Sequence, residues 1–174
     1  MHRDVMRMLT VAGVCLLLAG CVLQSEKPVY AEAEGKLVLK PLGSVFSAES
    51  YSNGAWKTEE GNLTFTVQGN HYVVNNSKDA NTAEALFADA GNGFAMMQFG
   101  EAEKPSTYVI AEVQKGAVLL RPVMCSDLKK AHVTSTVLTF TDNDCKLTGK
   151  PSAADVKAWA AALGPAGMRM VPKT

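Results

Sequence analysis

Short apolar runs separated by turn residues fill the chain from Leu37 onward. The clearest run, residues 63–67, alternates apolar and hydroxyl side chains, so that one face can be buried while the other faces water. Gln68-Gly69-Asn70 then leads into a second run at residues 71–74, and we expect the two runs to form a β-hairpin. The pattern therefore predicts strands in this part of the chain.

Two further hairpins are predicted downstream. Residues 85–88 and 94–99 flank Asn92-Gly93, a pair that tolerates the positive φ angles of a tight turn. Residues 107–113 and 117–120 flank Lys115-Gly116. Such spacing is typical of a sheet that closes on itself or packs in two layers. The predicted fold is mainly β: a small antiparallel β-barrel or β-sandwich of about seven to eight strands.

One helix is clearly marked, at residues 152–163. Ser152 and Asp155 have the spacing of a capping box, and Gly164-Pro165 ends the segment. Val156, Trp159 and Leu163 recur on one face, which we expect to pack on the β-sheet. Trp159 is best explained as a packing anchor, because a lone helix on a β domain needs a large buried group to hold it.

The first residues of the chain form a different kind of segment. Arg3 and Arg7 precede an apolar run at residues 9–19. That run is too short to cross about 30 Å of hydrocarbon as a helix, which takes roughly 20 apolar residues. A basic start followed by a short apolar run is typical of a secretory signal peptide, which is removed from the exported protein.

The apolar run ends at Leu18-Ala19-Gly20-Cys21, which resembles the lipobox of bacterial lipoprotein precursors. The resemblance implies cleavage before Cys21, after the Cys21 thiol has received a diacylglyceryl group, and anchoring of the mature chain in a bilayer through its acyl chains. Val22 follows the cysteine, where an Asp would favour retention in the inner membrane by the enteric sorting pattern. We therefore expect an outer-membrane lipoprotein that faces the periplasm.

This interpretation divides the chain into three parts. Residues 1–20 are the signal peptide, and residues 21–36 comprise the lipidated cysteine and a polar segment without periodicity, which we expect to be a flexible tether. Residues 37–174 are long enough for a single β-rich domain with one core.

Charge gives little indication of a binding partner. The whole chain carries 17 basic and 17 acidic side chains, and removal of residues 1–20 leaves a balance close to neutral. Such a chain has no field that would gather a polyanion, and no basic stripe with interleaved aromatic residues is present. We exclude nucleic-acid binding on these grounds.

The cysteines can be assigned once the signal peptide is recognised. Cys15 leaves with the peptide and Cys21 carries lipid, so that Cys125 and Cys145 remain. We expect them to form a disulfide, because an exported protein meets an oxidising compartment and the closed loop stabilises the fold by roughly 3 kcal/mol. The alternatives are two buried free thiols or part of a metal site, for which two cysteines alone are insufficient.

A short element, Gly54-Ala55-Trp56, resembles the Gly-x-Trp motif at the start of lipocalin-type barrels. A helix after the last long strand also fits that architecture. The resemblance implies a barrel that binds a small apolar molecule in its interior. The alternative is that Trp56 closes the bottom of an ordinary small β domain.

Catalytic patterns are missing from the sequence. It has no Gly-x-Ser-x-Gly elbow, no His-Glu-x-x-His motif and no glycine-rich phosphate loop. His71 and His132 are better explained as surface or edge residues than as general bases, and Asp142 and Asp144 as turn residues rather than calcium ligands. We therefore predict no catalytic residues, no metal ligands and no cofactor.

Two classes of function remain open. The first is a non-enzymatic envelope lipoprotein that binds a protein partner or a small apolar ligand, or acts as a structural module. The second is a periplasmic enzyme inhibitor or, with less support, an envelope enzyme. A polar concave site that holds a histidine beside a carboxylate would favour an enzyme, whereas a rigid protruding loop would favour an inhibitor.

Overall fold

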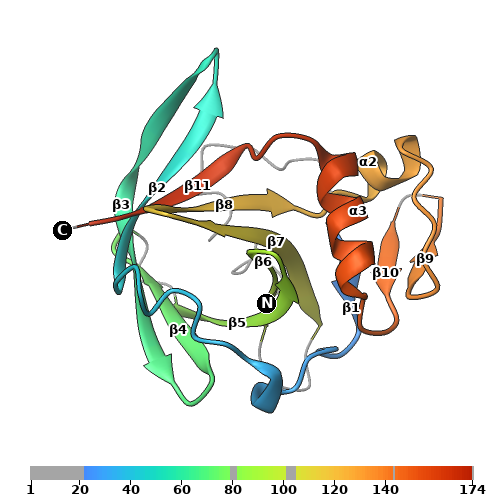
Figure 1. The fold of residues 1–174 in the computed structure, drawn as a ribbon, viewed down its shortest axis with the longest axis horizontal. Helices are drawn as coiled ribbons and strands as arrows, with labels where there is room; N and C mark the ends of the chain where they lie inside the picture. Colours follow the sequence, from blue (N-terminus) through green and yellow to red (C-terminus); the bar gives the residue numbers. More distant parts are fainter. Residues whose placement is uncertain (1–21, 79–81, 101–104, 143, 174) are drawn as a thin grey trace.

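Eight strands form a closed antiparallel barrel in a computed structural model, which describes residues 22–78, 82–100, 105–142 and 144–173 (Figure 1). Each strand pairs with the next along the chain from β2 to β8, and β11 closes the circle between β8 and β2. The strands are β2 (Val45–Ser52), β3 (Ala55–Gln68), β4 (His71–Asn76), β5 (Thr82–Gly91), β6 (Phe94–Phe99), β7 (Ser106–Gln114), β8 (Ala117–Pro122) and β11 (Met168–Pro172). The predicted β class is confirmed, and the barrel is the arrangement adopted.

The three predicted hairpins are confirmed as β3–β4, β5–β6 and β7–β8. Their turns contain glycines with positive φ angles, a conformation that costs glycine little: Gly69 at 59°, Gly93 at 82° and Gly116 at 84°. A fourth hairpin, β2–β3, turns at Asn53-Gly54, where both residues have positive φ as a two-residue hairpin turn requires.

The barrel interior is filled by side chains. All eight strands contribute to the buried interior cluster, together with Leu39 from the segment before β2. Four aromatic rings form a chain of edge contacts across it, with centroids 5.5 Å apart for Phe46–Phe65, 5.8 Å for Phe65–Tyr72 and 5.8 Å for Tyr72–Phe87. The amide of Leu39 donates to the Tyr72 hydroxyl at 3.1 Å, which satisfies that polar group within the core.

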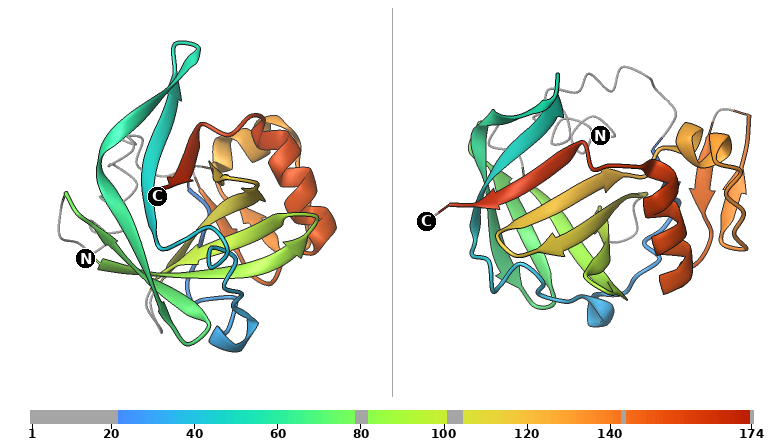
Figure 2. Two further views of the ribbon diagram at one scale, coloured as in Figure 1. Left: turned by 60° about the vertical axis from the view of Figure 1, so that its left-hand side comes forward. Right: turned by 45° about the horizontal axis from the view of Figure 1, so that its top comes forward.

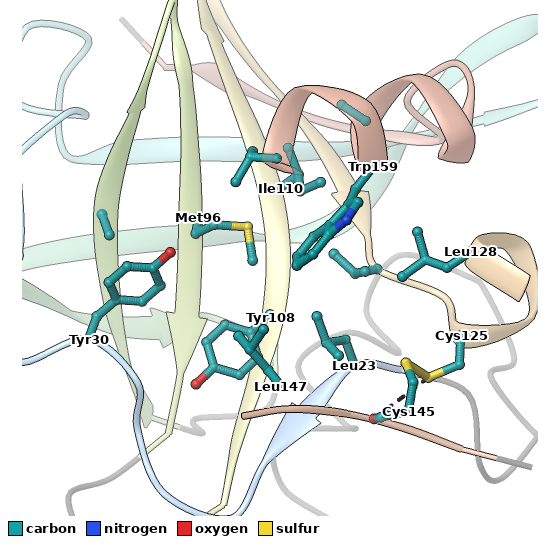
Figure 3. Close-up of a cluster of buried hydrophobic side chains, with 14 of the residues drawn as sticks. Leu23, Tyr30, Met96, Tyr108, Ile110, Cys125, Leu128, Cys145, Leu147 and Trp159 are labelled. Atoms are coloured by element: carbon teal, nitrogen blue, oxygen red, sulfur yellow. Dashed lines mark hydrogen bonds between the residues drawn. A yellow bond between two sulfur atoms is a disulfide. The ribbon is translucent and has the colours of Figure 1, made fainter. Parts of the chain in front are cut away.

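A second core lies outside the barrel, on the outer face of β5, β6 and β7 (Figure 3). It is covered by the helices α2 (Cys125–Lys130) and α3 (Ala153–Leu163) and by three short strands. These strands are β1 (Gln24–Ser25), β9 (Leu138–Phe140) and β10 (Cys145–Leu147). Strands β5 to β7 are thus buried on both faces, which explains why they are continuous apolar runs.

Helix α3 confirms the predicted helix. Asp155 N donates to Ser152 Oγ at 3.1 Å and Ser152 N donates to Asp155 Oδ2 at 2.9 Å, which is the predicted capping box. The helix ends at Gly164, whose φ is 72°. Trp159 is fully buried against the outer face of the barrel (Figure 3), so that its predicted role as a packing anchor is confirmed.

The segment before β2 differs from the expected flexible tether. Residues 22–36 contain β1 and a short 3-10 helix, Glu32–Glu34, and pack along the barrel wall. Leu23 is fully buried and Tyr30 is 9% exposed. Residues 22–36 therefore belong to the fold rather than to a flexible tether, because isolated apolar residues in this polar segment fill separate places in the outer core.

The alternative that Trp56 closes the bottom of the β domain is also corrected. Trp56 lies in the β2–β3 hairpin, half-buried and outside both hydrophobic clusters, so it does not close the bottom of the barrel. Within the described residues, no helix has the length and apolar character needed to cross a membrane.

Candidate functional site

The first candidate site is the place where the chain joins the barrel. Cys21 lies outside the described residues, and Val22 beside it forms an isolated β-bridge with Met124. Leu23 N donates to Val123 O at 2.8 Å. Gln24 then pairs with β7 on one side and, in parallel, with β10 on the other. Backbone pairing thus fixes the chain from the first described residue onward.

A buried network of hydrogen bonds joins residues 25–30 to the barrel wall. Ser25 Oγ lies 2.6 Å from the Tyr108 hydroxyl, which accepts a hydrogen bond from Val29 N at 3.2 Å and donates to Gln98 Oε1 at 3.1 Å. Burial raises the pKa of the Tyr108 hydroxyl, so this group stays neutral at physiological pH. The network therefore works as a fixed set of hydrogen bonds between the barrel wall and residues 25–30.

Gln98 extends the network to the next turn of the chain. Its side chain accepts from Tyr30 N at 3.1 Å and donates to Tyr30 O at 3.0 Å, so that one amide satisfies both backbone groups of a buried residue. Burial also raises the pKa of the Tyr30 hydroxyl, and the nearby Tyr108 and Glu34 act in the same direction. None of these residues carries a local sequence signal that marks it as part of a site.

The disulfide predicted between Cys125 and Cys145 is present, with Cα atoms 5.5 Å apart. It joins the start of α2 to the start of β10, and β10 is the parallel neighbour of β1. The bridge therefore braces the strand that lies beside β1. With both sulfur atoms in the bond, the alternatives of two free thiols or a metal site at these cysteines do not hold.

The two histidines in the described part of the chain lie apart on the fold. His71 starts β4, and its Nδ1 lies 3.5 Å from Glu32 Oε1 on the segment that packs against the β3–β4 turn. His132 is exposed, follows α2 and has a positive φ of 51°. Asp144 Oδ1 accepts from Cys145 N at 2.8 Å, as a turn residue does. Among residues 22–78, 82–100, 105–142 and 144–173, no group of three potential metal ligands occurs.

A second candidate surface is the β2–β3 hairpin, which extends beyond the other strands (Figure 2). Tyr51 is 52% exposed and contacts the Trp56 ring at a tilt of 59°, with ring centroids 5.2 Å apart. The Arg169 guanidinium lies 4.5 Å from the Trp56 ring centroid, and its Nε donates to Glu49 Oε2 at 2.5 Å. Aromatic rings and an arginine are the groups that most often carry binding energy in protein interfaces.

No family model matches the chain, and no curated protein or solved structure is significantly similar to it. The function must therefore be argued from the residues of this chain and their arrangement.

Proposed function

We propose that this chain is a lipid-anchored envelope lipoprotein of bacteria, acylated at Cys21 and facing the periplasm. The observation that carries the proposal is the Leu18-Ala19-Gly20-Cys21 motif at the end of a short apolar run that follows Arg3 and Arg7. The disulfide between Cys125 and Cys145 supports export, because such bonds persist in oxidising compartments. Val22 after the cysteine favours the outer membrane.

We further propose that the barrel is a non-enzymatic binding or structural module that acts through its outer surface. The filled interior supports a protein partner over a small apolar ligand, because the aromatic chain from Phe46 to Phe87 occupies the space such a ligand would need. The contact surface that we favour is formed by the exposed Tyr51, the half-buried Trp56 and Arg169.

The anchor is tested by replacing Cys21 with Ser. The wild-type protein should incorporate labelled palmitate and float with membranes, and Cys21→Ser should do neither. Cys125→Ser is the matched control, because it removes a cysteine that the proposal leaves unlipidated; this variant should still be labelled. Labelling of Cys21→Ser at the wild-type level would contradict the proposal.

A second function, inhibition of a periplasmic enzyme, is favoured by the protruding β2–β3 hairpin. A rigid hairpin that projects from a disulfide-braced β domain can occupy an active site without losing much conformational entropy. A photo-crosslinking residue at position 56 should capture a partner in cells, and the same residue at position 115 is the control. The inhibitor version requires that the captured partner be an enzyme whose activity falls when the purified domain is added.

A further inference from the structure

Almost no linker separates the proposed lipid anchor at Cys21 from the first paired residue of the sheet. Val22 bridges to Met124, the amide of Leu23 bonds to Val123, and Gln24 pairs with Thr107. Consecutive Cα atoms are about 3.8 Å apart. The sheet therefore begins one residue after the cysteine that would carry the acyl chains.

We infer that the barrel is seated directly against the bilayer, with the end that carries Val22, Met124 and α2 facing the lipid headgroups. This inference rests on the proposed acylation of Cys21. Acyl chains on that cysteine must enter the hydrocarbon, which brings the residue to the membrane surface. Because no spacer separates Cys21 from the sheet, the surface around the Val22–Met124 bridge comes with it.

The anchoring segment is held too firmly to peel away from the barrel as a substitute tether. Releasing it would expose Leu23, which is fully buried, and would break the contact between Ser25 and the Tyr108 hydroxyl. It would also leave the buried Gln98 side chain without its two bonds to the Tyr30 backbone. Each of these losses costs free energy, so residues 22–30 stay on the barrel and do not detach to serve as a longer tether.

The point at which the chain is attached to the lipid, and not a charged patch, decides which face of the protein meets the membrane. Lys129 and Lys130 lie in the last turn of α2, but Asp127 lies in its first turn. Beside β1, Lys146 is paired with Glu26 at 2.9 Å. Opposite charges are mixed here, so that electrostatic attraction to anionic lipids is not what seats the barrel.

The two ends of the molecule offer matched positions for a test. Lys130 is exposed at the end of α2, a helix of six residues and thus about 9 Å long, which starts directly after Met124. Lys115 is exposed in the β7–β8 turn, which lies at the opposite end of the longest axis from α2 (Figure 1). Lys130→Cys and Lys115→Cys each exchange one exposed lysine for one thiol.

The experiment measures the reaction of these thiols with N-ethylmaleimide. The acylated full-length mature protein is placed in vesicles of phosphatidylethanolamine and phosphatidylglycerol, and the Cys21→Ser form in solution gives the reference rate. We expect the acylated Lys130→Cys protein to react several-fold more slowly than its reference, and Lys115→Cys to react at its reference rate. A third protein has about ten Gly and Ser residues between Cys21 and Val22, a coil of roughly 15–20 Å. This insertion should restore the reaction of Lys130→Cys.

The outcomes separate the inference from the proposed function. Equal, unhindered reaction at both positions in protein that floats with the vesicles would overturn direct seating and leave the anchor intact. Protection of Lys130→Cys that persists with the spacer would overturn the short link as its cause. Absence of the diacylglyceryl mass on Cys21, with no flotation, would overturn the proposed function and the inference together.

Discussion

The Tyr108 hydroxyl lies 2.6 Å from Ser25 Oγ, although the two residues are 83 positions apart in the chain. Tyr108 belongs to β7 in the barrel, whereas Ser25 belongs to β1, which packs outside it. This contact joins β1 to the barrel through groups that are both buried.

Tyr108→Phe should destabilise the protein by about 1–3 kcal/mol, because it leaves the partners of the hydroxyl buried and unsatisfied. Denaturant unfolding measures the change, and hydrogen exchange should show faster exchange at residues 23–30. Tyr51→Phe is the matched control at an exposed tyrosine and should change stability by less than about 0.5 kcal/mol. Equal effects of the two substitutions would argue against the network.

Removal of the disulfide should cost about 2–4 kcal/mol. Thermal unfolding of the wild-type protein should therefore occur at a lower temperature after reduction. The double variant Cys125→Ser with Cys145→Ser should unfold at the same temperature with and without reductant. A wild-type melting temperature that does not respond to reduction would show that the bond contributes nothing to stability.

Phe65→Ala should cost about 3–5 kcal/mol, because Phe65 is 2% exposed and contacts two other rings in the filled interior. Val67→Ala, two residues along the same strand, removes a side chain that is 47% exposed and should change stability by less than about 0.5 kcal/mol. Chemical denaturation of both variants measures the contrast. Comparable losses at the two positions would mean that Phe65 does not belong to a closely packed barrel core.

Ser152→Ala should destabilise the protein by about 1 kcal/mol through loss of the side-chain cap of α3. Equilibrium unfolding measures this loss, and Ser126→Ala, an exposed serine in α2 for which no side-chain cap is seen, serves as control. A null result at Ser152 would indicate that packing of Trp159 alone holds the helix.

Stability should also depend on the protonation of Asp155. Burial opposes the charged form of this carboxyl, but hydrogen bonds from the Ser152 hydroxyl and amide, together with one from the Ser135 side chain, outweigh burial and hold its pKa below the ordinary value of 3.8. Because the pKa is lower in the folded state, the charged carboxylate stabilises the protein at pH values above its ordinary pKa. This contribution is lost as the pH falls through the folded-state pKa. The stability advantage of the wild type over Asp155→Asn should therefore be larger at about pH 7 than at about pH 2, as measured by denaturant unfolding. A constant difference across this range would contradict the assignment.

The hairpins and α3 could be predicted because their signals are local. Asn92-Gly93 marks its turn through residues that accept positive φ, and Ser152 with Asp155 marks a helix start within four positions. The hairpin at Asn53-Gly54 carried the same signal. It was missed because Gly54 was assigned to a Gly-x-Trp element instead.

The closure of the barrel and the course of residues 22–36 could not be predicted in this way. Pairing of β2 with β11 joins Glu49 to Arg169 across 120 positions, and no local pattern specifies such a pairing. In residues 22–36, Leu23 and Tyr30 are buried one at a time by a surface formed from β5 to β7. Because these apolar residues are buried at separate positions of the outer core and not along one face of a helix or strand, the segment shows no hydrophobic periodicity.

The candidate site was predictable only where chemistry is carried by residue type. Cys125 and Cys145 could be paired because the predicted signal peptide and lipobox account for the other two of the four cysteines. Ser25, Gln98 and Tyr108 form their network from three distant parts of the chain, and each is unremarkable by itself.

The position of β11 between β2 and β8 makes the barrel an all-or-nothing structure. All neighbouring pairs of barrel strands that do not involve β11 can form as the chain is synthesised. The pairs β2–β11 and β8–β11 form last, so the barrel stays open until Met168–Pro172 has been made. Long-range pairing of this kind folds slowly. A polypeptide interrupted before Met168 would present two bare strand edges to its neighbours, which are templates for aggregation, so premature termination should yield insoluble material instead of a smaller domain.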